Sequence, residues 1–224
     1  WFHDAIDREF GFQSPREIGY DVVGSIRAMH AGEASVFVGM GGNFLQATPD
    51  TGYTAEALQR CRLTVQVSTK LNRGHLVTGK VGLILPCLGR SEIDRNERGE
   101  PQFATVENSM SLVHQTRGTF KPASENLLSE TRIVARLAQA VLGDRTTVDF
   151  LELAGDYDRI RERVERVVPG FEDFNRRVRE PGGFYLPNGA RERKFATSTG
   201  KAEFSCERLS SADLEEGQLM LMTV

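Results

Sequence analysis

The sequence predicts an α/β fold, a three-layer α/β/α domain with a mostly parallel sheet. Three short apolar runs, at residues 35–38, 63–67 and 81–85, are separated by helical or turn segments. Apolar runs that alternate with helices are typical of a parallel sheet covered on both faces. Each run ends in glycines or polar residues, and right-handed crossovers bring such carboxyl ends to one edge. We therefore expect the strand ends near Gly41, Ser68 and Pro86 to meet.

Two helices are predicted around the first strand. Residues 14–30 read as a helix that begins with Ser14 as N-cap and Pro15 as the first helical residue. Apolar residues recur in it at helical spacing, from Ile18 to Met29. A shorter helix at 54–60 leads to the second strand.

The second half is predicted to be helical after a long irregular segment. Residues 89–128 are polar, and 95–101 read equally well as a functional loop or as disorder. Apolar stripes predict helices over 133–141, with Gly143 as C-cap, over 157–167, and from Phe171 onward, all facing a core. Residues 180–190 read as an extended connector, and 202–205 and 218–224 as strands. We expect residues 1–205 to form one domain and 206–224 to begin a β-rich one.

Composition excludes several classes of function. The 224 residues are 39% apolar and 26% charged, and 28 basic residues against 31 acidic ones give a net charge of −3. This balance is not that of a nucleic-acid-binding protein, and no run is long enough to span a bilayer. Cysteines number three and lie far apart, which predicts reduced thiols and a cytoplasmic protein. The chain starts at Trp1 rather than Met, so we expect a piece of a longer protein.

Common catalytic and nucleotide motifs are incomplete in this chain. Gly39 and Gly41 fit a dinucleotide fingerprint, but Phe44 stands where its third glycine belongs. The segment from Gly74 to Lys80 spells a phosphate-loop pattern, but it precedes a strand rather than a helix. Scattered histidines exclude a zinc site made by this segment alone. No nucleophile elbow surrounds any serine, so we predict no catalytic residue and no metal ligand here.

What remains is a polar rim at the predicted strand ends. Gly41, Gly42 and Asn43 follow the first strand, and Ser68 and Thr69 follow the second, where they could cap a helix. Asn72 and His75 are three residues apart and would share a helical face. The glycines could serve backbone conformation alone, or their amides could grip a polar ligand. Taken together, the amides, hydroxyls and imidazole suit a nucleotide better than an apolar ligand.

Several blocks of sequence resemble the molybdopterin oxidoreductases. The blocks are, in order, G-E-A-S-V-F-V-G-M-G-G-N-F-L-Q-A-T-P-D-T (32–51), V-Q-V-S-T-K-L-N-R-G-H (65–75), L-I-L-P-C-L-G-R-S-E-I-D (83–94), V-E-N-S-M-S-L-V-H-Q-T-R-G (106–118) and P-N-G-A-R-E-R-K-F-A-T-S-T-G-K-A-E-F (187–204). The Asn-Arg-Gly-His and Leu-Pro-Cys-Leu-Gly-Arg forms look like the formate-dehydrogenase-like alpha subunits. The resemblance covers nearly the whole chain.

This resemblance implies the third domain of a four-domain oxidoreductase. Such a domain holds one guanine dinucleotide half of the molybdenum cofactor, molybdopterin guanine dinucleotide. By position, the implied contacts are Gly41, Gly42, Asn43, Ser68, Thr69, Asn72, His75, Leu85 and Pro86. Any 4Fe-4S cluster, the molybdenum ligand and a small-molecule substrate site would involve other domains of the polypeptide. Ser68 and Val81-Gly82 depart from the acidic residues of many relatives, so the guanine contacts stay open. The alternative is a nucleotide-binding α/β module without redox activity of its own.

Overall fold

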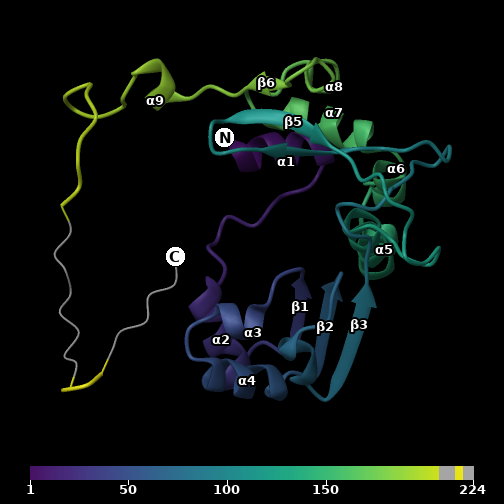
Figure 1. Cartoon of the computed structure of the whole chain (residues 1–224), viewed down its shortest axis with the longest axis vertical. Helices are drawn as coiled ribbons and strands as arrows, with labels where there is room; N and C mark the ends of the chain where they lie inside the picture. The colour runs from purple at the N-terminus through teal and green to yellow at the C-terminus, as the bar shows by residue number, and fades with distance from the viewer. Residues whose placement is uncertain (207–214, 219–224) are drawn as a thin grey trace. The chain divides into compact units, whose positions relative to one another are not determined.

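The computed structural model describes residues 1–206 and 215–218, which divide between Leu186 and Pro187 into two compact units. Figure 1 shows the elements of the first unit. Its helices are α1 (Phe2–Phe10), α2 (Val22–Ala31), α3 (Phe44–Ala47), α4 (Thr51–Arg60), α5 (Glu130–Leu142), α6 (Phe150–Gly155), α7 (Tyr157–Val167) and α8 (Phe174–Arg177), with 3₁₀ turns η1 (Arg73–Leu76) and η2 (Gly143–Arg145). Its strands are β1 (Val36–Met40), β2 (Leu63–Ser68), β3 (Val81–Pro86), β4 (Ala104–Glu107), β5 (Leu112–Thr116) and β6 (Phe184–Tyr185).

The first three strands form the predicted parallel sheet, in the order β1-β2-β3. Figure 1 shows the three arrows side by side and pointing the same way. Their observed bounds extend the predicted runs by one or two residues at the carboxyl end. The predicted α/β class with a mostly parallel sheet is therefore confirmed.

Helices α2, α3 and α4 cover one face of this sheet (Figure 1). Phe37 of β1 packs there against a buried cluster that includes Ile26 of α2 and Leu58 of α4. Helix α2 begins at Val22 rather than near Ser14, because the side chain of Asp21 caps it by accepting a hydrogen bond from the Gly24 N–H (2.6 Å). The predicted start of that helix is wrong.

The other face of the sheet presents nine side chains in three rows. The strand register aligns Val36 with Leu63 and Val81, Val38 with Val65 and Leu83, and Met40 with Val67 and Leu85. Side chains two residues apart in a strand share one face, so the nine form a single apolar surface. Helix α5 touches it through Ile133, near Val67 and Leu85. Much of the remainder is exposed, and this second face is covered only in part.

A second, antiparallel sheet takes two of its strands, β4 and β5, from the segment that was predicted to be irregular. Its order is β4-β5-β6, and β6 comes from the predicted connector. The segment between Arg95 and Pro101 forms a hydrogen-bonded turn closed by an antiparallel bridge between these two residues. The Asn96 side chain accepts hydrogen bonds from the N–H groups of Arg98 and Glu100 inside this turn.

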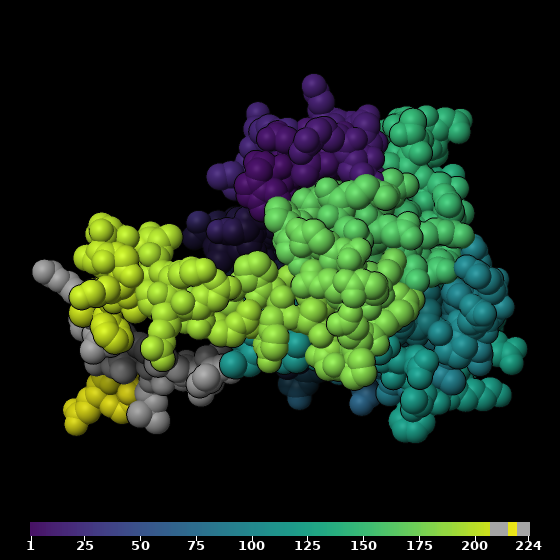
Figure 2. Space-filling model, turned by 90° about the horizontal axis from the view of Figure 1, so that it is seen from above, coloured from purple at the N-terminus to yellow at the C-terminus, as the bar shows by residue number. Residues whose placement is uncertain are grey.

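The helices predicted over 133–141 and 157–167 are confirmed as α5 and α7, but the helix predicted from Phe171 onward is only the short α8 (Phe174–Arg177), and the apolar stripe of α5 is half exposed rather than packed in a core. Ser129 caps α5, whose end is marked by Gly143, and Asp156 caps α7. Helix α1, which the sequence did not reveal, lies against α7 (Figure 2). Glu9 of α1 forms ion pairs there with Arg163 and Arg166. Burial opposes ionisation of Glu9, but the two arginines lower its pKa.

The second unit contains the short helix α9 (Gly189–Glu192), whose N-cap Asn188 accepts a hydrogen bond from the Arg191 N–H (2.9 Å). Residues 202–205, predicted as a strand, have no regular secondary structure, so that prediction is wrong. Beyond Gln218, the strand predicted over 218–224 lies outside the described residues. The domain predicted to begin at 206 stays a prediction.

Candidate functional site at the carboxyl edge of the sheet

The carboxyl ends of the three parallel strands lie at one edge, as the sequence predicted. Ser68 at the end of β2 pairs in register with Pro86 at the end of β3. The Gly41 N–H, just beyond β1, donates to the carbonyl oxygen of Val67 (2.8 Å). Open α/β sheets bind ligands outside such carboxyl ends. We call this edge, with Gly41, Gly42, Asn43, Asn72 and His75, the rim.

Both glycines of the rim turn have left-handed backbone conformations, with φ of 65° at Gly41 and 67° at Gly42. Only glycine adopts these angles without strain, so conformation alone requires both residues. The Gly41 N–H already donates to the Val67 carbonyl oxygen within the fold. In contrast, none of the described residues accepts a hydrogen bond from the N–H of Gly42 or Asn43. Space beside Gly42 is open, since a Cβ there would meet nothing within 4 Å.

The turn η1 is tied directly to the glycine turn. Asn72 Nδ2 donates to the Gly42 carbonyl oxygen (3.1 Å), although the two residues are 30 positions apart. Asn72 and His75 also form a capping box, in which Asn72 Oδ1 accepts from the Gly74 N–H and His75 Nδ1 accepts from the Asn72 N–H (3.0 Å). Asn72 is the extended N-cap of η1 rather than a helical residue, so the predicted shared helical face is wrong, although Asn72 and His75 are in contact.

Two buried polar atoms at the rim have no partner in the described residues. They are Oδ1 of Asn43 and Nε2 of His75. When His75 Nδ1 accepts from Asn72, the ring proton lies on Nε2, so one unpaired group is a donor and the other an acceptor. An unpaired buried polar group costs about 1–3 kcal/mol. Such a cost is typical of positions where a ligand or a water completes the hydrogen bonding.

The remaining predicted contacts do not all face the rim. Ser68 Oγ donates to the Lys70 carbonyl oxygen (2.7 Å), and no helix begins there, so the predicted helix cap is wrong. Thr69 is exposed beside it. Leu85 lies in the apolar face, packed with Val67 near Ile133, and Pro86 lies between that face and the rim.

One rim residue, Glu130, was missed by the sequence analysis. A Cβ built on Gly41 would lie 3.7 Å from Oε1 of Glu130, the first residue of α5. Its carboxylate is exposed and forms no ion pair within the described part of the chain. The rim therefore has an acidic acceptor, whereas the sequence predicted only uncharged groups. Burial raises the pKa of the neighbouring Cys87 thiol, and the negative charges of Glu130 and Glu92 raise it further.

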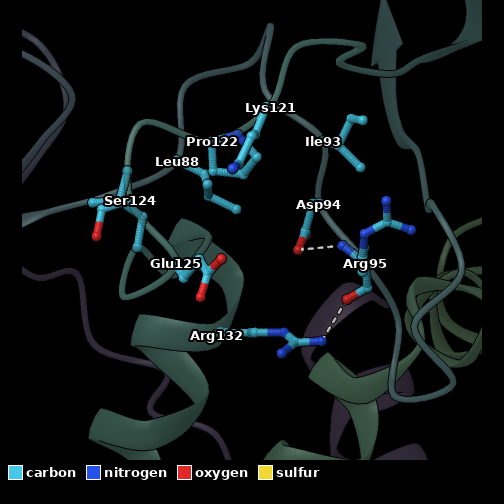
Figure 3. Close-up of a pocket in the computed structure, with 10 residues that line it drawn as sticks. Leu88, Ile93, Asp94, Arg95, Lys121, Pro122, Ser124, Glu125 and Arg132 are labelled. Carbon is cyan, nitrogen blue, oxygen red and sulfur yellow. Dashed lines mark hydrogen bonds between the residues drawn. The ribbon is translucent and has the colours of Figure 1, made fainter.

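A cavity of about 480 Å³ lies beyond the end of β3 (Figure 3). Arg132 of α5 donates to the carbonyl oxygen of Arg95 in its wall (2.5 Å). Asp94, also in the wall, accepts from the hydroxyl of Tyr157 (2.5 Å) and from Gln102 Nε2 (3.1 Å). The pKa of Tyr157 is raised to about 12, mainly by burial and next by the hydrogen bond to Asp94. These contacts connect the loop after β3 to α5 and α7.

We expect Tyr157→Phe to destabilise the first unit by about 2 kcal/mol, because it removes a hydrogen bond to a carboxylate. The ring would keep its packing, so the loss isolates the hydroxyl. Urea unfolding of residues 1–224 at pH 7 measures this change. A matched control is Tyr53→Phe, since the Tyr53 hydroxyl forms no hydrogen bond within the described residues. An equal effect of the two changes would contradict the assignment.

Neither a group of metal-binding side chains nor a membrane-spanning helix occurs in the described part of the chain. No group of three or more His, Cys, Asp and Glu side chains in residues 1–206 and 215–218 is placed to hold a metal ion. Among the helices of these same residues, none combines the length and apolar character needed to cross a membrane.

Comparison with known proteins identifies oxidoreductases among the relatives. The whole chain is 51% identical to a segment of an uncharacterized oxidoreductase of Mycobacterium tuberculosis, and equally to one of Mycobacterium bovis. Over 203 residues, 91% of the chain, it is 46% identical to protein YdeP of Escherichia coli. The chain spans 29% of the mycobacterial proteins and 26% of YdeP. No family model matches it.

Proposed function

We propose that this chain is the nucleotide-holding domain of a molybdopterin-dependent oxidoreductase that resembles formate dehydrogenases. The observation that carries the proposal is the set of unsatisfied polar groups at one rim: the N–H groups of Gly42 and Asn43 and the buried Asn43 Oδ1 and His75 Nε2. The oxidoreductase names of the mycobacterial relatives support the reaction class.

The chemistry of the rim fits a nucleotide. Backbone N–H groups at the end of a parallel strand suit phosphate oxygens, which accept hydrogen bonds without needing a full positive charge. Glu130 would accept from ribose hydroxyls or from the N–H groups of guanine, the role that acidic residues have in other nucleotide sites. Gly42, Asn43, His75 and Glu130 would thus hold one guanine dinucleotide half of the cofactor.

When bound, the cofactor would supply two-electron redox chemistry at molybdenum. The residues of this chain would bind and orient the nucleotide half and shield it from water. The substrate would lie between this domain and other domains of the polypeptide. We further propose that the protein lies in the cytoplasm. Formate is the candidate substrate, because the sequence resembles formate dehydrogenases.

Metal and nucleotide analysis of the full-length protein tests the proposed function. We expect about one molybdenum atom per polypeptide, together with guanine nucleotide released by acid. Nucleotide without molybdenum would favour the alternative, a nucleotide-binding module without redox activity. Absence of both, in protein expressed with molybdate in a host that makes the cofactor, would contradict both functions.

Substitution of Glu130 tests the acidic acceptor at the rim. We expect Glu130→Gln in the full-length protein to lower nucleotide content at least about tenfold, because a hydrogen bond to a charged group is worth about 1.5–3 kcal/mol. Glu125→Gln is the matched control, because Glu125 is also exposed and lines the separate cavity beyond β3. Unchanged or increased nucleotide content in Glu130→Gln would remove Glu130 from the site.

A further inference from the structure

The largest unexplained feature of the first unit is the apolar face of the parallel sheet. Its side chains are valine, leucine or methionine at all nine register positions. Val67 in the central strand is 2% exposed, but Val38 and Leu83 on the outer strands are 47% and 45% exposed. Soluble proteins rarely leave a contiguous apolar surface of this kind in water unless it is an interaction site.

Helix α5 makes this face one wall of a groove. The predicted apolar stripe of α5 includes Val134, Leu137 and Val141, which are about half exposed rather than packed in a core. Together, the helix and the sheet enclose about 910 Å³. Among the described residues that line the groove, only Ser124, Asn126 and Arg136 are polar. The groove therefore offers apolar contact and almost no hydrogen-bond partners.

This lining restricts what can fill the groove. A backbone buried against it must satisfy its own N–H and carbonyl groups, because an unpaired buried group is costly. An α-helix meets that condition within one segment. The dimensions also agree, since three strands about 4.8 Å apart offer a surface about 10 Å across, close to the diameter of a helix. Parallel sheets normally have helices on both faces.

We propose that a helix from the part of the polypeptide outside these 224 residues packs in this groove, with an apolar side toward β1, β2 and β3. The relatives are more than three times as long as the chain, which spans 29% of them, so most of such a polypeptide remains to supply the helix. A second copy of this chain fits less well, because an isologous dimer would face one concave groove with another. The proposal does not depend on the cofactor.

Photo-crosslinking of the full-length protein tests the occupant. A benzophenone amino acid replaces Val38 in the groove, and the same probe replaces the exposed Arg27 of α2, on the other side of the sheet, as the matched control. We expect the probe at 38, but not at 27, to join a peptide outside residues 1–224 of the same molecule. A cross-link between two copies, or to α5 alone, would overturn the proposal.

A smaller substitution keeps the test valid if the bulky probe prevents folding. Val38→Cys is made with Cys206→Ser, because Cys206 is exposed whereas Cys61 and Cys87 are buried. In the full-length protein we expect maleimide to modify position 38 at least about tenfold more slowly than in the urea-unfolded protein, since only transient opening would expose it. Modification at the unfolded rate, identified by peptide mass spectrometry, would show an open groove and overturn the proposal.

Discussion

Gly42→Ala should lower the cofactor content of the full-length protein about tenfold, which corresponds to roughly 1.4 kcal/mol of binding free energy. A methyl group at Gly42 would occupy the open space beside the unpaired N–H groups of the rim, where the nucleotide is proposed to approach the backbone. Nucleotide released by acid, counted per polypeptide, measures the effect.

The control for this change is Gly32→Ala. Gly32 ends α2 with φ of 81° and, like Gly42, has nothing within 4 Å of the position that a methyl group would take. Both substitutions therefore impose a left-handed conformation on alanine, at a similar cost of about 1 kcal/mol. Only Gly42 lies at the rim. Equal cofactor loss in the two variants would show that strain, not contact with a ligand, explains the glycine.

Asp158→Ala should destabilise the first unit by about 3 kcal/mol, because it leaves a buried arginine without its carboxylate. Arg161, whose side chain is 5% exposed, forms an ion pair with Asp158, and Arg179 forms another (2.6 Å). Arg161 also lies over the ring of Phe103, 4.1 Å from its centroid, so it joins α7 to the segment before β4. Urea unfolding of residues 1–224 at pH 7 measures the loss.

Asp173→Ala provides the comparison, since Asp173 pairs with Arg176 and both side chains are 64% exposed. Such an exposed pair contributes less than about 1 kcal/mol.

The pH dependence of the Asp158→Ala effect adds a second check. Burial opposes ionisation of Asp158, but hydrogen bonds from Arg179 and Arg161 lower its pKa below 3.8. Its stabilisation is thus present above pH 3.8 and lost as the pH falls below it. A difference from wild type that persists at lower pH would contradict this ion pair.

The parallel sheet could be predicted because its strands are dense apolar runs and its crossovers obey a single handedness. The antiparallel sheet could not, since β4 and β5 are short and β6, which pairs with β5, follows about 70 residues later, beyond four helices. The start of α2 was misplaced because Ser14 and Pro15 form a plausible cap by sequence. In the structure the Ser14 N–H instead donates to Asp7 (2.7 Å), which fixes the end of α1.

The site was predictable in its position but not in its charge. Glycines and asparagines at strand ends are visible in the sequence, as is the three-residue spacing of Asn72 and His75. Glu130 reads as an ordinary acidic residue at a helix N-terminus, and only the fold brings it beside Gly41, which is 89 residues earlier. The unpaired atoms of Asn43 and His75 likewise follow from burial, which no local pattern encodes.

A structure of the full-length protein purified with its cofactor tests the central claim most directly. The account predicts density for a guanine nucleotide at the rim, with phosphate or ribose oxygens within hydrogen-bond distance of the Gly42 or Asn43 N–H groups. Density for the nucleotide elsewhere, with the rim filled only by water or by another segment of protein, would contradict it.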